Sequence, residues 1–184
     1  LKLPKAETLY GKEALVEKIR RKIRAPIKIV LTGHGKVGNG AKEILDAMKM
    51  KSVSIENYLT KTYTEPVYTQ IDALDYNKRK DGKPSDLEDF YKNPSAYTSD
   101  FERFTKVSDI FIAGHFYANG APVILTREML QANDNKIKVI ADISCDVNGP
   151  IASPLNASYI AGPLFGFLHN QHKEVEVFHP AASV

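Results

Sequence analysis

The fold of this chain is decided by the stretch IKIVLTGHGKVGNG, residues 27–40. Residues 27–32 are mostly aliphatic or β-branched, which is typical of a buried strand, and a cluster of glycines follows at once. Residues 40–50, GAKEILDAMKM, then place apolar side chains at helical spacing. Because a strand, a glycine loop and a helix follow one another, this stretch predicts the first half of a βαβ unit in a parallel sheet.

The glycine loop matches the pattern G-x-G-x-x-G, in which each glycine has a separate mechanical role. Gly33 permits a tight turn, Gly35 leaves room for a pyrophosphate at the backbone, and Gly38 permits close packing of helix on strand. The unpaired N–H groups and the dipole of the helix N-terminus favour an anion there. The loop therefore predicts a dinucleotide site made of Gly33, His34, Gly35, Lys36, Val37 and Gly38.

Other interpretations of the glycine loop fit its spacing less well. A phosphate-binding loop of the ATPase type needs four residues between its glycines and then Lys-Ser or Lys-Thr, whereas Asn39-Gly40 follows Gly38. A protein-kinase loop joins two antiparallel strands, but a helix is expected here. A methyltransferase that binds S-adenosylmethionine is the weaker alternative because the spacing is that of a dinucleotide site. A glycine turn that binds no nucleotide stays open as well.

The rest of the chain alternates strands and helices, which predicts an α/β fold of the Rossmann type. We expect a doubly wound, mostly parallel sheet with helices on both faces. The expected strands are 66–71, 108–114 and 137–144, with a weak one at 52–55, and the expected helices are 11–24, 101–107 and 126–132.

The chain is expected to divide into three parts. Residues 1–25 carry a linking helix that would follow an absent substrate domain, residues 26–166 form the dinucleotide-binding domain, and residues 167–184 are a polar tail. Within the domain, residues 73–100 form a turn-rich excursion with some local helix, because a structureless connection of this length is uncommon.

Composition excludes several classes of protein. With 25 Lys and Arg against 22 Asp and Glu the net charge is +3, which does not favour nucleic acid or a membrane surface as partner. No run reaches roughly 18 consecutive apolar residues, and the first residues do not show the basic, apolar and small-residue succession expected of a secretory signal. Its one cysteine, Cys145, excludes an internal disulfide and favours a cytoplasmic location, where we expect an inert buried thiol.

The choice between NAD and NADP depends on an acidic residue at the end of the strand that follows the glycine loop. Glu56 stands at the usual distance after the weak strand, and Asp72 follows the more convincing strand at 66–71. We favour Asp72, whose carboxylate would accept hydrogen bonds from the ribose hydroxyls and repel a 2′-phosphate. This predicts NAD, with NADP as the alternative because the basic run 78–80 is also suited to a phosphate.

Residues at the ends of the two later strands are further candidates, because ligands bind at the carboxyl edge of an open parallel sheet. Gly114, His115, Asp142 and Ser144 are expected to contact the cofactor, and Asp146 is expected to face the nicotinamide or the substrate. We favour a plain loop residue over a proton-transfer role for the side chain of His115, although a histidine on a strand-end loop is suited to proton transfer. The scattered histidines and single cysteine show no zinc spacing, so we expect no metal.

Two segments resemble one known family. Ala121-Pro122, Thr126-Arg127-Glu128-Met129 and Asp142-Ile143-Ser144-Cys145-Asp146 resemble motifs of the nucleotide-binding half of the alanine dehydrogenase, transhydrogenase and saccharopine dehydrogenase superfamily. With the glycine loop, this resemblance covers residues 26 to about 166. The motif D-I-S-C-D and the excursion look most like the lysine-forming saccharopine dehydrogenase branch. The motif D-Q-G-G of alanine dehydrogenases is absent.

The resemblance implies an NAD(P)-dependent dehydrogenase that acts on a CH–NH group of an amino-acid adduct, in lysine metabolism. In that family the catalytic Lys and His come from an N-terminal substrate domain, so this chain alone is expected to bind nucleotide and turn over little. The aspartate that matches Asp146 lies beside the reacting centre there. An amino-acid substrate and a homodimer of the full-length protein are implied partners. The alternative is a non-catalytic module that senses NAD(H).

Overall fold

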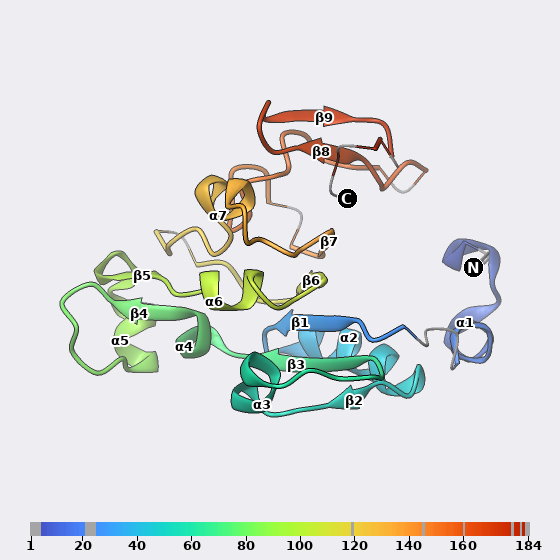
Figure 1. Ribbon diagram of the computed structural model, residues 1–184, viewed down its shortest axis with the longest axis horizontal. Coiled ribbons are helices and arrows are strands. Elements are labelled where there is room, and N and C mark those ends of the chain that lie inside the picture. The colour runs from blue at the N-terminus through green and yellow to red at the C-terminus, as the bar shows by residue number, and fades with distance from the viewer. Residues whose placement is uncertain are drawn as a thin grey trace.

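A computed structural model describes residues 5–20, 25–118, 120–144, 146–159, 161–177, 179–180 and 182 of the chain. Its centre is a five-stranded parallel sheet in the order β2-β3-β1-β6-β7 (Figure 1). The strands are β1 (Lys28–Thr32), β2 (Lys51–Ser52), β3 (Val67–Ile71), β6 (Ile110–Ala113) and β7 (Val139–Asp142).

Strand β1 lies in the middle of the sheet, between β3 and β6. After β1 the chain first builds the β2 and β3 side and then crosses to β6 and β7, so the winding reverses beside β1. In register, Thr32 at the end of β1 lies opposite Ile71 on one side and Ala113 on the other. The carboxyl ends of these three strands are therefore level, at the place where open α/β sheets bind ligands.

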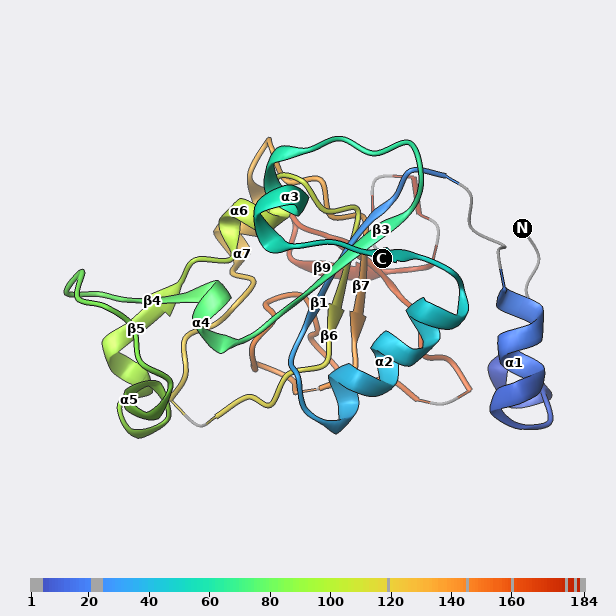
Figure 2. The same cartoon turned by 90° about the horizontal axis from the view of Figure 1, so that it is seen from below.

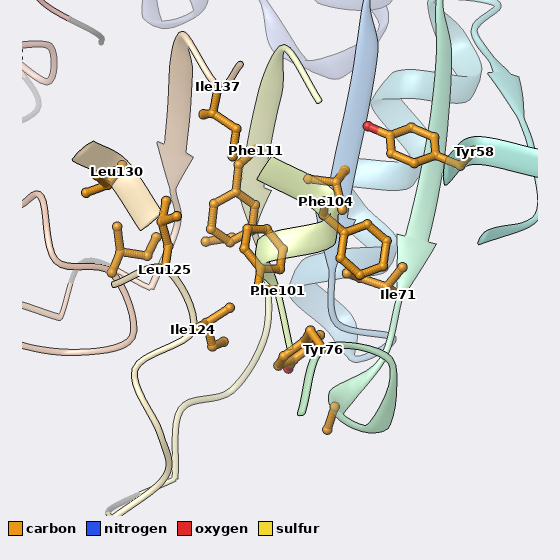
Figure 3. Packing of buried hydrophobic residues seen from close by; sticks show 14 of the residues in the cluster. Tyr58, Ile71, Tyr76, Phe101, Phe104, Phe111, Ile124, Leu125, Leu130 and Ile137 are labelled. Atoms are coloured by element: carbon orange, nitrogen blue, oxygen red, sulfur yellow. The ribbon is translucent and has the colours of Figure 1, made fainter. Parts of the chain in front are cut away.

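Helices cover both faces of the sheet (Figures 1 and 2). On one face α2 (Lys36–Ala47) packs Leu45 against Leu31 of β1. On the other face a larger core gathers buried residues of α3 (Ile55–Thr60), α6 (Glu102–Thr105) and α7 (Arg127–Gln131). Figure 3 shows Phe101 and Phe111 in this core, with ring centroids 4.6 Å apart. The doubly wound α/β fold expected from the sequence is confirmed.

The excursion at residues 73–100 projects from the sheet on the side opposite α1 in both views (Figures 1 and 2). It has the local helix expected from the sequence and an antiparallel strand pair that was not expected. Its elements are α4 (Ala73–Tyr76), β4 (Asn77–Arg79), α5 (Leu87–Lys92), the 3-10 helix η2 (Pro94–Ala96) and β5 (Tyr97–Ser99). Buried Phe90 and Tyr97 meet edge to face, with ring centroids 5.1 Å apart, and hold α5 on the strand pair.

The N-terminal helix is shorter than the expected range of 11–24. After a 3-10 helix, η1 (Ala6–Thr8), helix α1 runs from Gly11 to Ile19, and Arg20 has already left the helical conformation with ψ at 122°. Residues 21–24 lie outside the described part of the chain. Only Ile19 of α1 is buried, so little apolar packing supports further turns.

The weak strand expected at 52–55 is also cut short. Strand β2 ends at Ser52, because Ser54 caps the next helix and its hydroxyl accepts a hydrogen bond from the Asn57 N–H. Ser and Thr at such positions favour a helix start over a strand. Ile55 therefore begins α3 and does not extend the sheet.

The expected tail contains regular structure. Strands β8 (Gly166–Leu168) and β9 (Lys173–Val175) form an antiparallel hairpin, so the boundary expected between 166 and 167 falls inside β8. Phe167 is buried, and the Glu174 carboxylate accepts a hydrogen bond from the Leu155 N–H at 2.9 Å. Within the described residues, no helix is both long and apolar enough to cross a membrane.

Candidate functional site

Two of the three glycines of the loop are required by the fold itself. Gly33 has a φ of +92°, and its N–H donates to the Ile71 carbonyl at 2.9 Å. A Cβ on Gly33 would lie 2.6 Å from the Gly114 carbonyl oxygen, and a Cβ on Gly38 only 2.0 Å from the Gly33 oxygen. The tight turn and the close helix-to-strand packing expected from the sequence are therefore present.

Gly35 is different, because nothing in the described protein requires a glycine there. A Cβ on Gly35 would meet no atom within 4 Å. Gly35 is the N-cap of α2, and no side chain caps the helix. The N–H groups of the first turn, at Lys36, Val37 and Gly38, lack partners within the helix. Such an uncapped helix start, with its positive dipole end, suits an anionic group.

A pocket of about 470 Å³ lies at this edge of the sheet. Eight of the residues predicted from the sequence line it together: Gly33, His34, Gly35, Lys36, Val37, Asp72, Gly114 and His115. His34 is exposed, and its carbonyl accepts a hydrogen bond from the Asn39 side chain at 2.9 Å. The glycine loop and the ends of β3 and β6 therefore form one wall of a single cavity.

The rest of the lining forms the excursion wall, and sequence reasoning did not assign its residues to the site, although Ala121 and Pro122 belong to a motif of the resembled family. They belong to the excursion and to the loop after β6, and five of the eleven are aromatic: Ala73, Tyr76, Asn77, Phe90, Tyr91, Phe116, Tyr117, Ala118, Ala121, Pro122 and Ile124. Tyr76 is buried at the edge of the core drawn in Figure 3, and burial raises the pKa of its hydroxyl. The one available signal was the crowding of tyrosines in the middle of the sequence.

Asp72 has the position expected of a ribose ligand, and Glu56 does not. Asp72 is half-buried at the end of β3, directly beside β1, and lines the pocket. It also caps α4, because its carboxylate accepts a hydrogen bond from the Ala73 N–H at 2.8 Å. Glu56 is exposed on α3 and does not line the pocket. The reason is that β3, not β2, pairs with β1.

The basic run at 78–80 makes its contacts inside the excursion. Lys78 pairs with Asp100 at 2.6 Å, Arg79 pairs with Asp81 and Asp89, and Lys80 donates to the Ser95 carbonyl at 2.7 Å. None of these three basic residues lines the pocket. The positions of these three side chains therefore do not support the alternative in which residues 78–80 bind the 2′-phosphate of NADP.

His115 is buried, with 8% of its surface exposed. Its Nδ1 lies 2.6 Å from the Thr32 hydroxyl, and its ring centroid is 6.0 Å from that of Tyr76. Burial lowers its pKa to about 4, although the charges of Asp142 and Asp146 act in the opposite direction. Burial therefore favours the neutral imidazole, which does not support the alternative of proton transfer by His115 near neutral pH.

The residues after β7 lie apart from this pocket. Asp142 is half-buried and accepts hydrogen bonds from the N–H and the hydroxyl of Ser144, at 3.0 and 2.6 Å. Asp142 lines a smaller cavity of about 100 Å³ in front of the β8–β9 hairpin. Asp146 is exposed in a turn, and the pKa of Tyr117 at the pocket wall is raised first by burial and then by the charge of Asp146. Cys145 lies outside the described residues.

The described part of the chain holds no cluster of three or more His, Cys, Asp or Glu side chains placed to bind a metal ion. The titratable side chains that line the pocket come from the glycine loop, the end of β3, the excursion and the loop after β6: His34, Lys36, Asp72, Tyr76, Tyr91, His115 and Tyr117. What the site offers chemically is uncapped backbone N–H groups on one wall, a carboxylate at the edge, and aromatic faces on the other wall.

Comparison with known proteins gives one distant relative. No protein-family model matches the chain. In an alignment that is 162 residues long and covers 77% of this chain, the chain is 27% identical to an alpha-aminoadipic semialdehyde synthase from Arabidopsis thaliana. The aligned part makes up 15% of that relative, so the chain spans a small fraction of its length. The similarity is loosely consistent with the superfamily that the sequence motifs resemble.

Proposed function

We propose that this chain is the dinucleotide-binding domain of an oxidoreductase, with NAD as its cofactor. The observation that carries the proposal is Gly35: no contact within the described protein calls for a glycine at a helix start that no side chain caps. A pyrophosphate can approach the backbone only where no Cβ stands in its way. The helix start opens on the pocket at the reversal of the winding, which is the usual ligand position in this fold.

The residues present fit a dinucleotide. The α2 N-terminus would hold the pyrophosphate, and Asp72 would accept hydrogen bonds from the hydroxyls of one ribose and repel a 2′-phosphate. His115 would stay neutral and add no charge next to the bound group. When bound, the nicotinamide supplies the hydride chemistry, and the protein contributes position and electrostatics.

We propose further that the reaction is of the saccharopine dehydrogenase kind, with hydride transfer at the Cα–N centre of an amino-acid adduct in lysine metabolism. Support comes from the resemblance of residues 121–129 and 142–146 and from the similarity to alpha-aminoadipic semialdehyde synthase. Asp146 is our candidate on the substrate side, since its charge reaches His115 and Tyr117 at the pocket. A cytoplasmic location and a homodimer of the full-length protein stay predictions.

A second candidate is a module that senses NAD(H) without catalysis. The lowered pKa of His115 fits this candidate, because the buried imidazole stays neutral at neutral pH, and it fits equally an enzyme whose catalytic Lys and His lie in another domain. An assay of saccharopine-dependent NAD reduction on the full-length gene product separates the two. Turnover supports the enzyme, and dinucleotide binding without turnover supports the sensor.

Cofactor binding itself is tested by calorimetric titration of NADH, NADPH and S-adenosylmethionine into the chain. We expect NADH to bind with the highest affinity and S-adenosylmethionine not to bind. Binding of S-adenosylmethionine alone would overturn the proposed function, and a preference for NADPH would overturn the role given to Asp72.

A further inference from the structure

The excursion wall of the pocket contains a buried side-chain amide, that of Asn77, in which the nitrogen forms a hydrogen bond and the oxygen does not. Asn77 begins β4 and is 3% exposed. Its Nδ2 donates to the Ala73 carbonyl at 3.0 Å. Because a carbonyl oxygen can only accept, this contact fixes which end of the amide is which. Oδ1 is then a buried acceptor, and it has no hydrogen-bond partner within the described structure.

A second buried polar atom on the same pocket is also without a partner. The Nε2 of His115 has none among the described residues, while its Nδ1 is engaged by Thr32. Asn77 and His115 both line the pocket, and Tyr76, next to Asn77 in sequence, has its ring centroid 6.0 Å from that of His115. Buried polar atoms are rarely left unpaired, and two of them on separate elements at one cavity point to a polar ligand there.

The surroundings of Asn77 indicate the kind of ligand. Tyr76, Phe90 and Tyr91 line the same wall and offer aromatic faces to a flat ring. Asp72 precedes the short helix α4 and Asn77 follows it. At a rise of about 1.5 Å per residue, the two lie roughly 7 Å apart, which is the scale of one nucleoside. A ribose on Asp72 would therefore place its base towards Asn77.

We infer that Asn77 recognises the adenine of the dinucleotide, its Oδ1 accepting a hydrogen bond from the exocyclic 6-amino group. This inference rests on the proposed function and adds a base-specific contact to it. Hypoxanthine carries an oxygen in place of that amino group, so two acceptors would face each other. Asn77 would then discriminate between the bases, because an unpaired buried acceptor disfavours the wrong ligand.

The test compares NADH with reduced nicotinamide hypoxanthine dinucleotide, titrated into the full chain by calorimetry. We expect the wild type to bind NADH roughly tenfold more tightly, and Asn77→Leu to bind both with similar affinity. Asn77→Asp keeps an acceptor oxygen and should keep the preference. Asn135→Leu is the matched control, because Asn135 donates to the Leu130 carbonyl, is fully paired through Ile137, and lies outside this pocket.

The outcomes separate the two proposals. If wild type binds the two dinucleotides equally, the role of Asn77 is overturned while the dinucleotide site stands, and a buried water is then the partner of Oδ1. An undiminished preference in folded Asn77→Leu overturns it as well. If neither dinucleotide binds, the proposed function itself fails. If Asn77→Leu does not fold, the role of Asn77 is still tested by the titrations of both dinucleotides into wild type and into Asn77→Asp.

Discussion

The two walls of the pocket are built on different principles. The wall at the glycine loop is main chain, with an uncapped helix start and no side chain at Gly35. The wall at the excursion consists of side chains, namely aromatic rings and the amide of Asn77. Backbone N–H groups can hold any phosphate, whereas an amide acceptor beside flat rings can distinguish one base from another. The first wall would therefore give affinity and the second selectivity.

Within the glycine wall there is a further difference. Gly33 and Gly38 are glycines because backbone atoms of the protein itself approach closely, whereas Gly35 faces open space. Substitution should therefore harm folding at Gly38 and ligand binding at Gly35. Each of the following experiments tests one part of this comparison.

The largest effect is expected from Gly38→Ala. The new Cβ would lie 2.0 Å from the Gly33 carbonyl oxygen, so the backbone at residue 38 and the backbone at Gly33 would have to move apart. We expect the free energy of unfolding to fall by about 3 kcal/mol or more, measured by urea denaturation. Unchanged stability would show that the loop does not pack on α2 as described.

Gly35→Val should separate binding from folding. Because no protein atom stands near the added side chain, the melting temperature should change little. The side chain would occupy the space proposed for the pyrophosphate, so the dissociation constant for NADH should rise by about 100-fold or more. A folded variant that binds NADH as tightly as wild type would exclude this placement of the phosphates.

His115 should make stability depend on pH. Its pKa is lowered from 6.5 to about 4 in the folded chain, so the unfolded chain binds more protons between these values. Stability is therefore complete above about pH 6.5 and decreases by about 3 kcal/mol as pH falls to 4. Denaturation of wild type and His115→Asn across this range measures the free energy of unfolding at each pH. That free energy should change less with pH in the variant. An equal dependence on pH in both proteins would mean that the pKa of His115 is the same in the folded and the unfolded chain.

Asp72→Ala should raise the dissociation constant for NADH by about tenfold and that for NADPH by less. The reason is that the carboxylate is proposed to bind a ribose that carries no phosphate. Asp72 also caps α4, so Asp72→Asn is the matched control. The amide keeps a cap oxygen but removes the charge, and it should improve NADPH binding relative to NADH. Equal effects on both dinucleotides in both variants would contradict the assignment of Asp72.

The smallest effect is expected from Gly40→Ala. Gly40 lies inside α2, and a Cβ there would meet no other atom within 4 Å. Alanine should therefore stabilise the chain by about 0.5–1 kcal/mol and leave NADH binding unchanged. This variant is the control for Gly38→Ala, since both change a glycine of the same helix. A loss of stability would mean that α2 does not extend through residue 40 as an ordinary helix.

The sequence predicts the glycine wall well because its features are local. Strand β1, the turn at Gly33 and helix α2 follow from adjacent residues, and the same holds for Asp72 directly after the mostly buried strand β3. The excursion wall depends on contacts that no spacing reveals. Asn77 reaches the pocket because β4 pairs with β5, more than twenty residues away at Ser99, and the neutral state of His115 depends on its burial.

The central claim is that a dinucleotide lies with its phosphates on the start of α2, and NMR titration tests it most directly. NADH is added to ¹⁵N-labelled chain while the backbone amides of Gly35, Lys36, Val37 and Gly38 are followed. We predict that these amides shift most and saturate together, whereas those of the β8–β9 hairpin stay in place. Binding of NADH that leaves these four amides unmoved, or no binding at all, would contradict the claim.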